Sequence, residues 1–467
     1  MNELQPLPGD RARLISRVTP GVPAPARRVL FLVACALASL AGTVPAHAAP
    51  AMRDCRPDKS VRFAVLSDTH LYDARLGTSG SAFQAYLVEN PNLAALSQPI
   101  LEAALADIMK SKVRFVIISG DLTKDGEVVD HLLMVRYLER LERAGIQVFV
   151  VPGNHDINNH DAARYSGDTA TPIPSASPWL FRLLYQRFGY GQAIDHAPDS
   201  LSYVAEPAPG LWLLALDSVK WAESAQSPHP LVSGRLSDAT LAWALTKLQQ
   251  AQTRGKKVIA FMHHGVNMHF FAEPVVFADY LVDNWPVVGA QLAGAGLKVI
   301  FTGHYHALDA AWPVDANGVP QPGTLCDIQT SSLVEFPCAY RIAELDGAGQ
   351  LHIESRRVTS IAADLGGVPF QQYADTFLRS ILPYPVTYTL ETQFGLSDAE
   401  AATVAPLVVD ALIANYAGDE SPSPETLAML QWLLGSPEPY HTLGELLGSL
   451  WIDLPPSDHQ LVVPVGS

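Results

Sequence analysis

Six short apolar runs recur between residues 62 and 306, and each one ends in polar residues. The runs are RFAVLSD, VRFVIISGD, IQVFVVPGN, LWLLALD, KKVIAFMHH and LKVIFTGHYH. Stretches with helical spacing lie between them, at residues 97–111, 127–145, 238–252 and 285–293. Strands that are buried on both faces and alternate with helices predict a layered α/β domain.

The residues after 306 add two features to this prediction, a pair of antiparallel strands and a helical C-terminal region. Residues 338–358 have the pattern of two antiparallel strands with a turn at Asp346-Gly347, which favours a mixed sheet or two stacked sheets. After about Ile361 the pattern becomes helical, with proline-rich links. We therefore expect an α/β domain at residues 49–360 and a helical C-terminal domain at residues 361–467.

The first 48 residues have the pattern of an export signal. Arg27 and Arg28 precede the apolar run VLFLVACALASLAG, and a small-residue cleavage pattern ends at Ala48. This pattern predicts a signal peptide at residues 1–48 and a periplasmic or secreted protein. The run is short for a membrane span, so no stable span is expected in the mature form. Lipoprotein anchoring at Cys35 is a minor alternative.

The bulk composition restricts the class of partner. Of the 467 residues, 48% are hydrophobic and 17% are charged, which is enough for a sizeable core and excludes global disorder. The formal net charge of −16 disfavours a nucleic-acid polymer as partner. A small phosphoester substrate remains compatible with this charge, because bound metal ions would make the site locally cationic. The oligomeric state is left open.

Two of the cysteines could form a disulfide. Cys326 and Cys338 flank the segment DIQTSSLVEFP, which could form a hairpin-like turn, and an oxidising compartment would allow a bridge. Cys55 would then be free or paired with another molecule.

Side chains that can bind metal ions stand at the ends of five apolar runs. They are Asp68 and His70, Asp121, Asn154 with His155 and Asp156, His263 with His264, and His304 with His306. Ligands bind at the carboxyl ends of strands in α/β sheets, so neighbouring strands would bring these groups into one site. Imidazoles and carboxylates without thiolates favour Mn, Fe, Zn or Ni, and one carboxylate can bridge two metal ions about 4 Å apart.

The ordered set D-x-H, G-D, G-N-H-D, H and G-H-x-H resembles the calcineurin-like metallophosphoesterase superfamily over residues 61–309. The resemblance implies a four-layer αββα sandwich, in which helices flank two mixed β-sheets, here with a C-terminal helical appendage. It also implies that two divalent metal ions are bound. The first would be held by Asp68, His70, Asp121 and His306, and the second by the shared Asp121 with Asn154, His263 and His304. His155 would act near the leaving group, and Asp156 would orient its imidazole.

Several subfamilies remain open. The stretches GDLTKDGE and GHYHALD look like those of bacterial class III cyclic nucleotide phosphodiesterases, whereas Lys124 stands where purple acid phosphatases carry a tyrosine ligand. We expect an exported dinuclear phosphodiesterase, acting on a small diester such as a cyclic nucleotide, with a water ionised between the two metal ions as the nucleophile. The alternatives are a phosphomonoesterase, a sphingomyelinase-like phospholipid diesterase, or a metal-binding scaffold without turnover.

Overall fold

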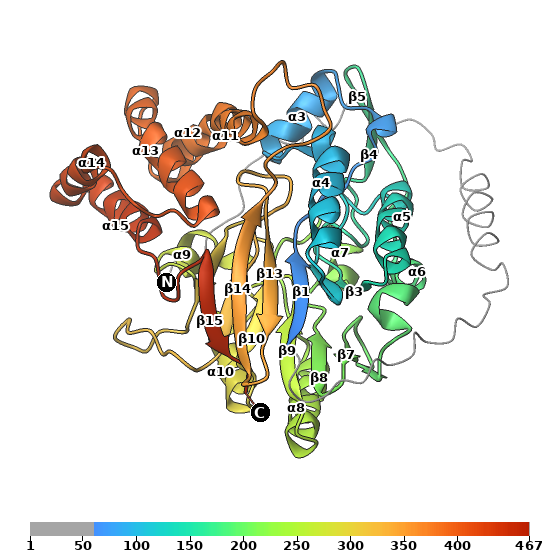
Figure 1. Cartoon of the computed structure of the whole chain (residues 1–467). Coiled ribbons are helices and arrows are strands. Elements are labelled where there is room, and N and C mark those ends of the chain that lie inside the picture. Colours follow the sequence, from blue (N-terminus) through green and yellow to red (C-terminus); the bar gives the residue numbers. More distant parts are fainter. Residues whose placement is uncertain (1–59, 467) are drawn as a thin grey trace. The chain divides into compact units, whose positions relative to one another are not determined.

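Two mixed β-sheets form the centre of the protein in the computed structural model, which describes residues 60–466 (Figure 1). In spatial order the first sheet holds β15 (Gln460–Pro464), β14 (Gln350–Arg357), β13 (Ala339–Leu345), β1 (Val61–Leu66), β2 (Phe115–Ser119) and β3 (Gln147–Val151). The second holds β11 (Asp309–Ala311), β12 (Cys326–Gln329), β10 (Val299–Thr302), β9 (Lys257–Phe261), β8 (Leu211–Ala215), β7 (Tyr203–Ala208) and β6 (Asp195–His196). A separate hairpin joins β4 (Ala163–Ser166) and β5 (Thr169–Pro172).

The two sheets pack face to face through their apolar side chains. Phe63 on β1 stacks on Phe115 of β2, and its edge meets Phe301 on β10 of the other sheet with ring centroids 5.9 Å apart. These strands are apolar at successive positions because both of their faces are covered.

Helices cover the outer face of the second sheet and the part of the first sheet formed by β1, β2 and β3. The first sheet packs against α4 (Ser97–Lys110) and α5 (Val128–Arg143), and the second against α8 (Asp238–Thr253) and α10 (Trp285–Gly294). The shorter helices are α3 (Ser81–Glu89), α6 (Pro178–Leu184), α7 (Trp221–Ser224) and α9 (Glu273–Val276). The expected four-layer αββα arrangement is therefore confirmed, and so is the antiparallel pairing of β13 with β14.

The C-terminal segment is mostly helical, as expected. Its helices are α11 (Phe370–Ile381), α12 (Pro383–Gln393), α13 (Asp398–Ala417), α14 (Pro424–Gly435) and α15 (Tyr440–Leu450). They enclose an apolar cluster of their own, which also takes in Phe270, Tyr305 and Ala307 from the loops that follow β9 and β10. The helices therefore pack directly behind the loop that carries His304 and His306.

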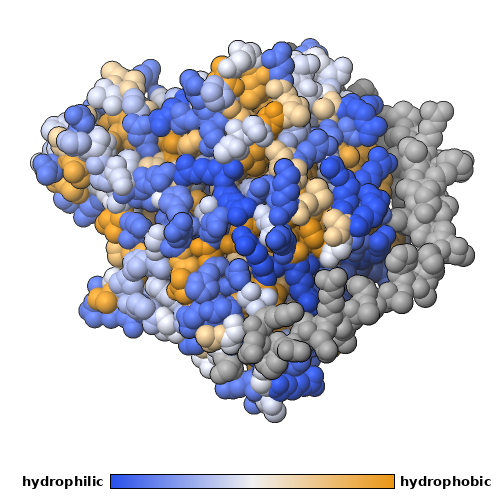
Figure 2. Space-filling view, viewed as in Figure 1, coloured by the Kyte–Doolittle hydropathy of each residue, from blue (hydrophilic) through white to orange (hydrophobic). Residues whose placement is uncertain are grey.

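The last strand was not anticipated from the sequence. β15 pairs antiparallel with β14 and becomes the edge of the first sheet. Its residues alternate between exposed and buried, which fits a strand with one face on the core. The outward faces of β13 and β14 carry Glu344, His352 and Glu354, and Figure 2 shows mainly hydrophilic side chains over this part of the surface.

We predict that the core depends on this strand. Val463 is fully buried, whereas its neighbour Val462 is 54% exposed. The Val463→Asp variant should lose roughly 3 kcal/mol of unfolding free energy or more, because it places a carboxylate in an apolar core. The Val462→Asp variant should change it by less than about 0.5 kcal/mol. Urea unfolding of both variants measures the difference, and equal losses would show that β15 does not contribute to the core.

The cysteine expectation is corrected by the fold. Cys326 lies in β12 of the second sheet, and Cys338 stands directly before β13 of the first, and both are free buried thiols. The segment between them crosses from one sheet to the other instead of turning back as a hairpin, so its ends are not brought together. The predicted signal peptide, Cys35 and Cys55 lie outside the described residues. Among residues 60–466 no helix is both long and apolar enough to cross a bilayer.

Candidate metal centre

The sheet topology brings the polar strand ends together. β1, β2 and β3 are parallel neighbours, so the segments carrying Asp68, Asp121 and Asn154 leave the first sheet at the same edge. β9 and β10 are parallel neighbours in the second sheet and deliver His263 and His304. The two sets are linked directly, because the His304 backbone N–H donates to Asp68 Oδ2 at 3.0 Å.

One group of side chains consists of Asp68, His70 and His306. Their ligand atoms face a common point: His306 Nε2 lies 3.3 Å from Asp68 Oδ1 and 3.4 Å from His70 Nε2. Asp68 and His70 are buried, whereas the His306 side chain is 20% exposed. Asp121 adjoins this group, since its Oδ2 is 3.8 Å from His70 Nε2.

A second group consists of Asp121, His263 and His304, with Asn154 beside it. Oδ2 of Asp121 lies 3.3 Å from His263 Nε2, and Asn154 Oδ1 lies 2.9 Å from the same nitrogen. The rings of His263 and His304 are 4.7 Å apart between centroids. Asp121 therefore stands between the two groups, which is the place expected of a bridging carboxylate.

The backbone is strained at five of these positions. Asp68, His70, Asp121, His304 and His306 all have positive φ angles, between 35° and 72°. Non-glycine residues seldom adopt this conformation, and where they do, it often marks a functional site. These five residues follow β1, β2 and β10, so the turns that leave these three strands contain this unusual conformation.

The donor atoms fit a pair of divalent cations. His306 Nδ1 lies 2.6 Å from Glu335 Oε2 and is placed to donate to it, so the lone pair of Nε2 faces Asp68 and His70. His263 likewise donates from Nδ1 to the Ser119 carbonyl oxygen, which leaves Nε2 facing two oxygens. Such facing acceptors repel one another unless a proton or a cation lies between them.

Several buried polar atoms of the site also have no hydrogen-bond partner. These atoms are Asp68 Oδ1, His70 Nδ1 and His304 Nε2. Buried polar atoms are seldom left unsatisfied, so Asp68 Oδ1 and His304 Nε2 are candidate metal-binding atoms, whereas His70 faces the site through its other nitrogen, Nε2. The oxygens and imidazole nitrogens present suit Mn, Fe, Zn or Ni, as the sequence also indicates.

His155 has a different partner from the expected one. Its Nδ1 lies 2.8 Å from Asp125 Oδ1, and its backbone N–H donates to Asp121 Oδ1. Burial lowers the pKa of His155, but the carboxylates of Asp121 and Asp125 together raise it to about 9. The two carboxylates thus favour the imidazolium form of His155, and Asp125, 2.8 Å from Nδ1, is the carboxylate that orients the ring.

Asp156 has a structural position instead. Its two oxygens accept hydrogen bonds from the backbone N–H groups of Leu122, Thr123 and Gly153 and from the Thr123 hydroxyl. With these four bonds the carboxylate is saturated and joins the segment after β2 to the segment after β3. The expectation that Asp156 orients the imidazole of His155 is corrected by these contacts.

Asp125 also forms an ion pair with Lys124. Its ammonium group contacts Asp125, lies 3.2 Å from Glu127 Oε1, and sits 4.2 Å from the ring centroid of Tyr86. Burial opposes the charge of Lys124, but the two carboxylates raise its pKa well above the usual range. A buried lysine cation thus stabilises the carboxylate that faces His155. Neither the contact of Asp125 with His155 nor that of Glu335 with His306 was predicted from the sequence, because no local motif marks them.

The three aromatic residues His269, Phe270 and Phe271 lie in different surroundings and do not line one common pocket. His269 is buried and lies 3.2 Å from Asp309, Phe270 is buried in the C-terminal apolar cluster, and Phe271 is 40% exposed. His264 is also buried, and its two nitrogens are used by the Ser218 hydroxyl and the Val232 carbonyl.

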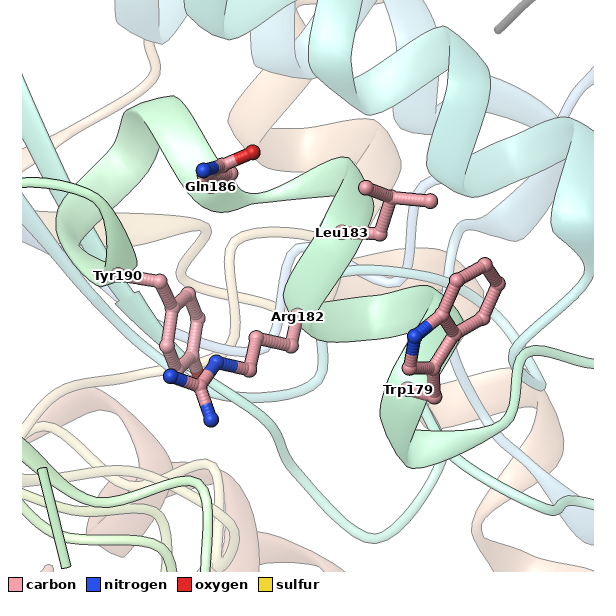
Figure 3. A pocket seen from close by; sticks show the side chains of 5 residues that line it. All are labelled: Trp179, Arg182, Leu183, Gln186 and Tyr190. Carbon is pink, nitrogen blue, oxygen red and sulfur yellow. The ribbon is translucent and has the colours of Figure 1, made fainter.

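A cavity of about 370 Å³ lies elsewhere, on α6 and the turn that follows it (Figure 3). It is lined by Trp179, Arg182, Leu183, Gln186 and Tyr190, and none of these belongs to the strand ends. We therefore place the functional site at the polar cluster and not at this cavity.

A fold of two packed mixed sheets with this cluster at the strand ends defines a metallophosphoesterase. The sequence profile of calcineurin-like phosphoesterases matches residues 61–308, more than half of the chain, and the chain belongs to this family. The family comprises metal-dependent phosphoester hydrolases that typically hold two divalent ions.

Individual relatives are more distant. Sphingomyelin phosphodiesterase 2 of Caenorhabditis elegans is 27% identical over 189 residues, which cover 37% of this chain and 29% of that protein. A dimetal phosphatase from Danio rerio aligns with 64% of this chain and 97% of its own at 16% identity and a TM-score of 0.45. A purple acid phosphatase from yellow lupin (Lupinus luteus) aligns with 64% of this chain and 52% of its own at 10% identity and a TM-score of 0.40.

Proposed function

We propose that this chain is an exported phosphodiesterase that hydrolyses a small diester at a dinuclear metal centre. The observation that carries the proposal is the position of Asp121 between two groups of imidazole and carboxylate donors. Asp68, His70, Asp121 and His306 would hold one ion, and Asp121, Asn154, His263 and His304 the other. When bound, two divalent ions supply an activated water nucleophile and positive charge for the phosphoryl oxygens.

The chain's own residues would assist departure of the leaving group. His155 is 24% exposed at its side chain, so a substrate oxygen can reach it, and Asp125 keeps its Nδ1 proton in place. As an imidazolium, His155 would donate its other ring proton, or a strong hydrogen bond, to the departing alkoxide. Glu335 would hold His306 in the tautomer that presents its Nε2 lone pair.

The charge around the site supports a diester more than a monoester. Lys124, the cationic side chain next along the chain from the Asp121 turn, is neutralised by Asp125 and Glu127 and is completely buried. A phosphodiester carries a single negative charge, whereas a monoester carries up to two and gains more from additional cations. The similarity to a sphingomyelin phosphodiesterase also favours diester cleavage.

The first test compares a diester with its monoester. We expect kcat/KM for bis-p-nitrophenyl phosphate to exceed that for p-nitrophenyl phosphate by about tenfold or more, in the presence of added Mn²⁺. The Asp121→Asn variant, purified identically, controls for contaminating hydrolases. A preference for the monoester would make the chain a phosphomonoesterase, and metal-loaded protein without any turnover would leave the scaffold alternative.

A second candidate is a phospholipid diesterase, which the named relative favours. Release of phosphocholine from sphingomyelin, compared with hydrolysis of a cyclic nucleotide, separates the two diester classes. Export rests on residues 1–48, and the N-terminal sequence of the protein recovered from cells tests it: a chain beginning near residue 49 supports cleavage of a signal peptide.

A further inference from the structure

The imidazole of His304 has no hydrogen bond that could orient it. A histidine that binds a metal ion usually donates its other ring N–H to a carboxylate or a carbonyl oxygen. His306 has Glu335 in this role, at 2.6 Å, and His263 has the Ser119 carbonyl oxygen, at 2.9 Å. In the part of the chain that the structure describes, neither ring nitrogen of His304 has such a partner, and its Nε2 is buried. Other contacts must therefore fix the direction of this ring.

Two aromatic rings that are not themselves candidate ligands contact the His304 imidazole. The ring of His264 lies 4.4 Å away between centroids, at an interplanar angle of 61°, and the ring of Tyr280 lies 4.6 Å away at 38°. Both distances are those of aromatic pairs in direct contact. Because His304 is only 4% exposed, its ring cannot rotate without meeting these neighbours.

His264 is itself held rigidly. Its Nδ1 accepts from the Ser218 hydroxyl at 2.7 Å, and its Nε2 donates to the Val232 carbonyl oxygen at 2.8 Å. A Cβ added at Gly234 would lie 2.4 Å from Cγ of the same ring, so the backbone there approaches the imidazole as closely as glycine allows. With both nitrogens used, His264 has no lone pair left for a metal ion and can act on His304 only through its ring.

Tyr280 is supported by its backbone and by other aromatic rings. Its carbonyl oxygen accepts from the Gly265 N–H at 3.1 Å, which ties it to the loop that follows β9. Its ring also contacts the rings of Phe277 and Tyr305, at 5.8 Å and 5.3 Å between centroids. The Tyr280 hydroxyl has no hydrogen-bond partner among residues 60–466, so the ring is the part of the side chain that contacts His304.

We propose that Tyr280 and His264 are positioning residues that hold the His304 imidazole in place for one of the two metal ions. The inference rests on the dinuclear centre of the proposed function. His304 belongs to the second donor group, and in the described structure neither ring contacts His70 or His306 of the first group. Loss of the Tyr280 ring should therefore weaken the binding of one ion and leave the other unchanged.

The test measures metal affinity instead of turnover. The full-length protein is dialysed against decreasing free Mn²⁺, and the Mn²⁺ content per chain is measured by mass spectrometry. We expect Tyr280→Ala to lose one of its two ions at a free Mn²⁺ concentration about 10–100-fold higher than the wild type does. Tyr280→Phe keeps the ring and should bind both ions as the wild type does. His264→Ala should weaken the same ion as Tyr280→Ala.

Tyr416→Ala is the matched control for the loss of a tyrosine ring. Tyr416 is partly exposed, as Tyr280 is, and its ring contacts Tyr305, with centroids 5.8 Å apart, but not His304. This variant should keep both ions with unchanged affinity.

Distinct outcomes separate this inference from the proposed function. Wild-type protein that binds no Mn²⁺ would remove the dinuclear centre and this inference with it. Wild-type protein with two ions, together with equally tight binding of both by Tyr280→Ala, would overturn the positioning role alone. A parallel loss of both ions, or an equal loss in Tyr280→Phe, would also overturn it, because contact of the ring with His304 explains neither. If His264→Ala fails to fold, Tyr280→Ala decides, since this side chain is partly exposed.

Discussion

The Asp121→Asn variant is expected to lose at least about a thousandfold in kcat/KM, equivalent to about 4 kcal/mol of transition-state stabilisation. Its Oδ2 lies 3.3 Å from His263 Nε2 and 3.8 Å from His70 Nε2, between the two donor groups. Oδ2 is the oxygen that faces both groups, and in the variant this oxygen belongs to a neutral amide, which binds two cations much more weakly than a carboxylate does. Metal content measured by mass spectrometry should fall from two ions per chain to one or fewer.

The matched control for this change is Asp168→Asn, in the exposed turn of the β4–β5 hairpin, which should retain full activity and both ions. Circular dichroism establishes that the Asp121→Asn variant is folded. If that variant kept two metal ions and wild-type turnover, the assignment of Asp121 as the shared ligand would fail, and with it the dinuclear centre proposed here.

The His155→Ala variant is expected to keep its metal ions and to lose roughly a hundredfold or more in kcat, because it removes the group that assists the leaving oxygen. The loss should be larger for a diester with an alkyl leaving group than for bis-p-nitrophenyl phosphate, since p-nitrophenolate departs without a proton. His160→Ala is the matched control: this histidine lies five residues further on and contacts the Ser224 carbonyl, and its removal should not change kcat.

The partner of His155 can be identified by a double-mutant cycle. Asp125→Asn should lower kcat for the alkyl diester about tenfold or more, and the His155→Ala/Asp125→Asn double variant should be no slower than His155→Ala alone, because the two residues act as a unit. Asp156→Asn should instead lower the unfolding temperature, since its carboxylate accepts three backbone N–H groups. Unchanged hydrolysis of the alkyl diester by Asp125→Asn would exclude Asp125 as the positioning residue.

The sequence was sufficient to predict most strands, most long helices and the residues of the site, because these follow from the pattern of neighbouring residues along the chain. The runs that became β1, β2, β3, β9 and β10 are apolar throughout, and the metal-binding side chains follow each run within a few residues. Parallel neighbours then bring their ends to one edge without further information. The same reasoning could not place β15, because a five-residue alternating strand is too short to distinguish from a loop before its partner is known.

The carboxylate that contacts His155 could not be predicted from the sequence. Asp156 is adjacent in sequence, but the backbone turn after β3 directs its carboxylate to the N–H groups of Leu122 and Thr123. Asp125 comes from the segment after β2 and meets the imidazole only because β2 and β3 are neighbours. Adjacency in the chain predicted the wrong carboxylate, since consecutive side chains in a turn do not point in the same direction.

By itself, the amino-acid sequence determined the class of fold, the family and the set of residues from which a dinuclear centre can be built. All of these follow from which residues stand at the end of each apolar run. Only the tertiary structure decided which carboxylate serves His155, that Glu335 supports His306, that the two cysteines lie apart, and that the C-terminal segment closes the first sheet. These contacts join positions far apart in the chain, and they depend on the directions in which buried side chains point, which no local pattern encodes.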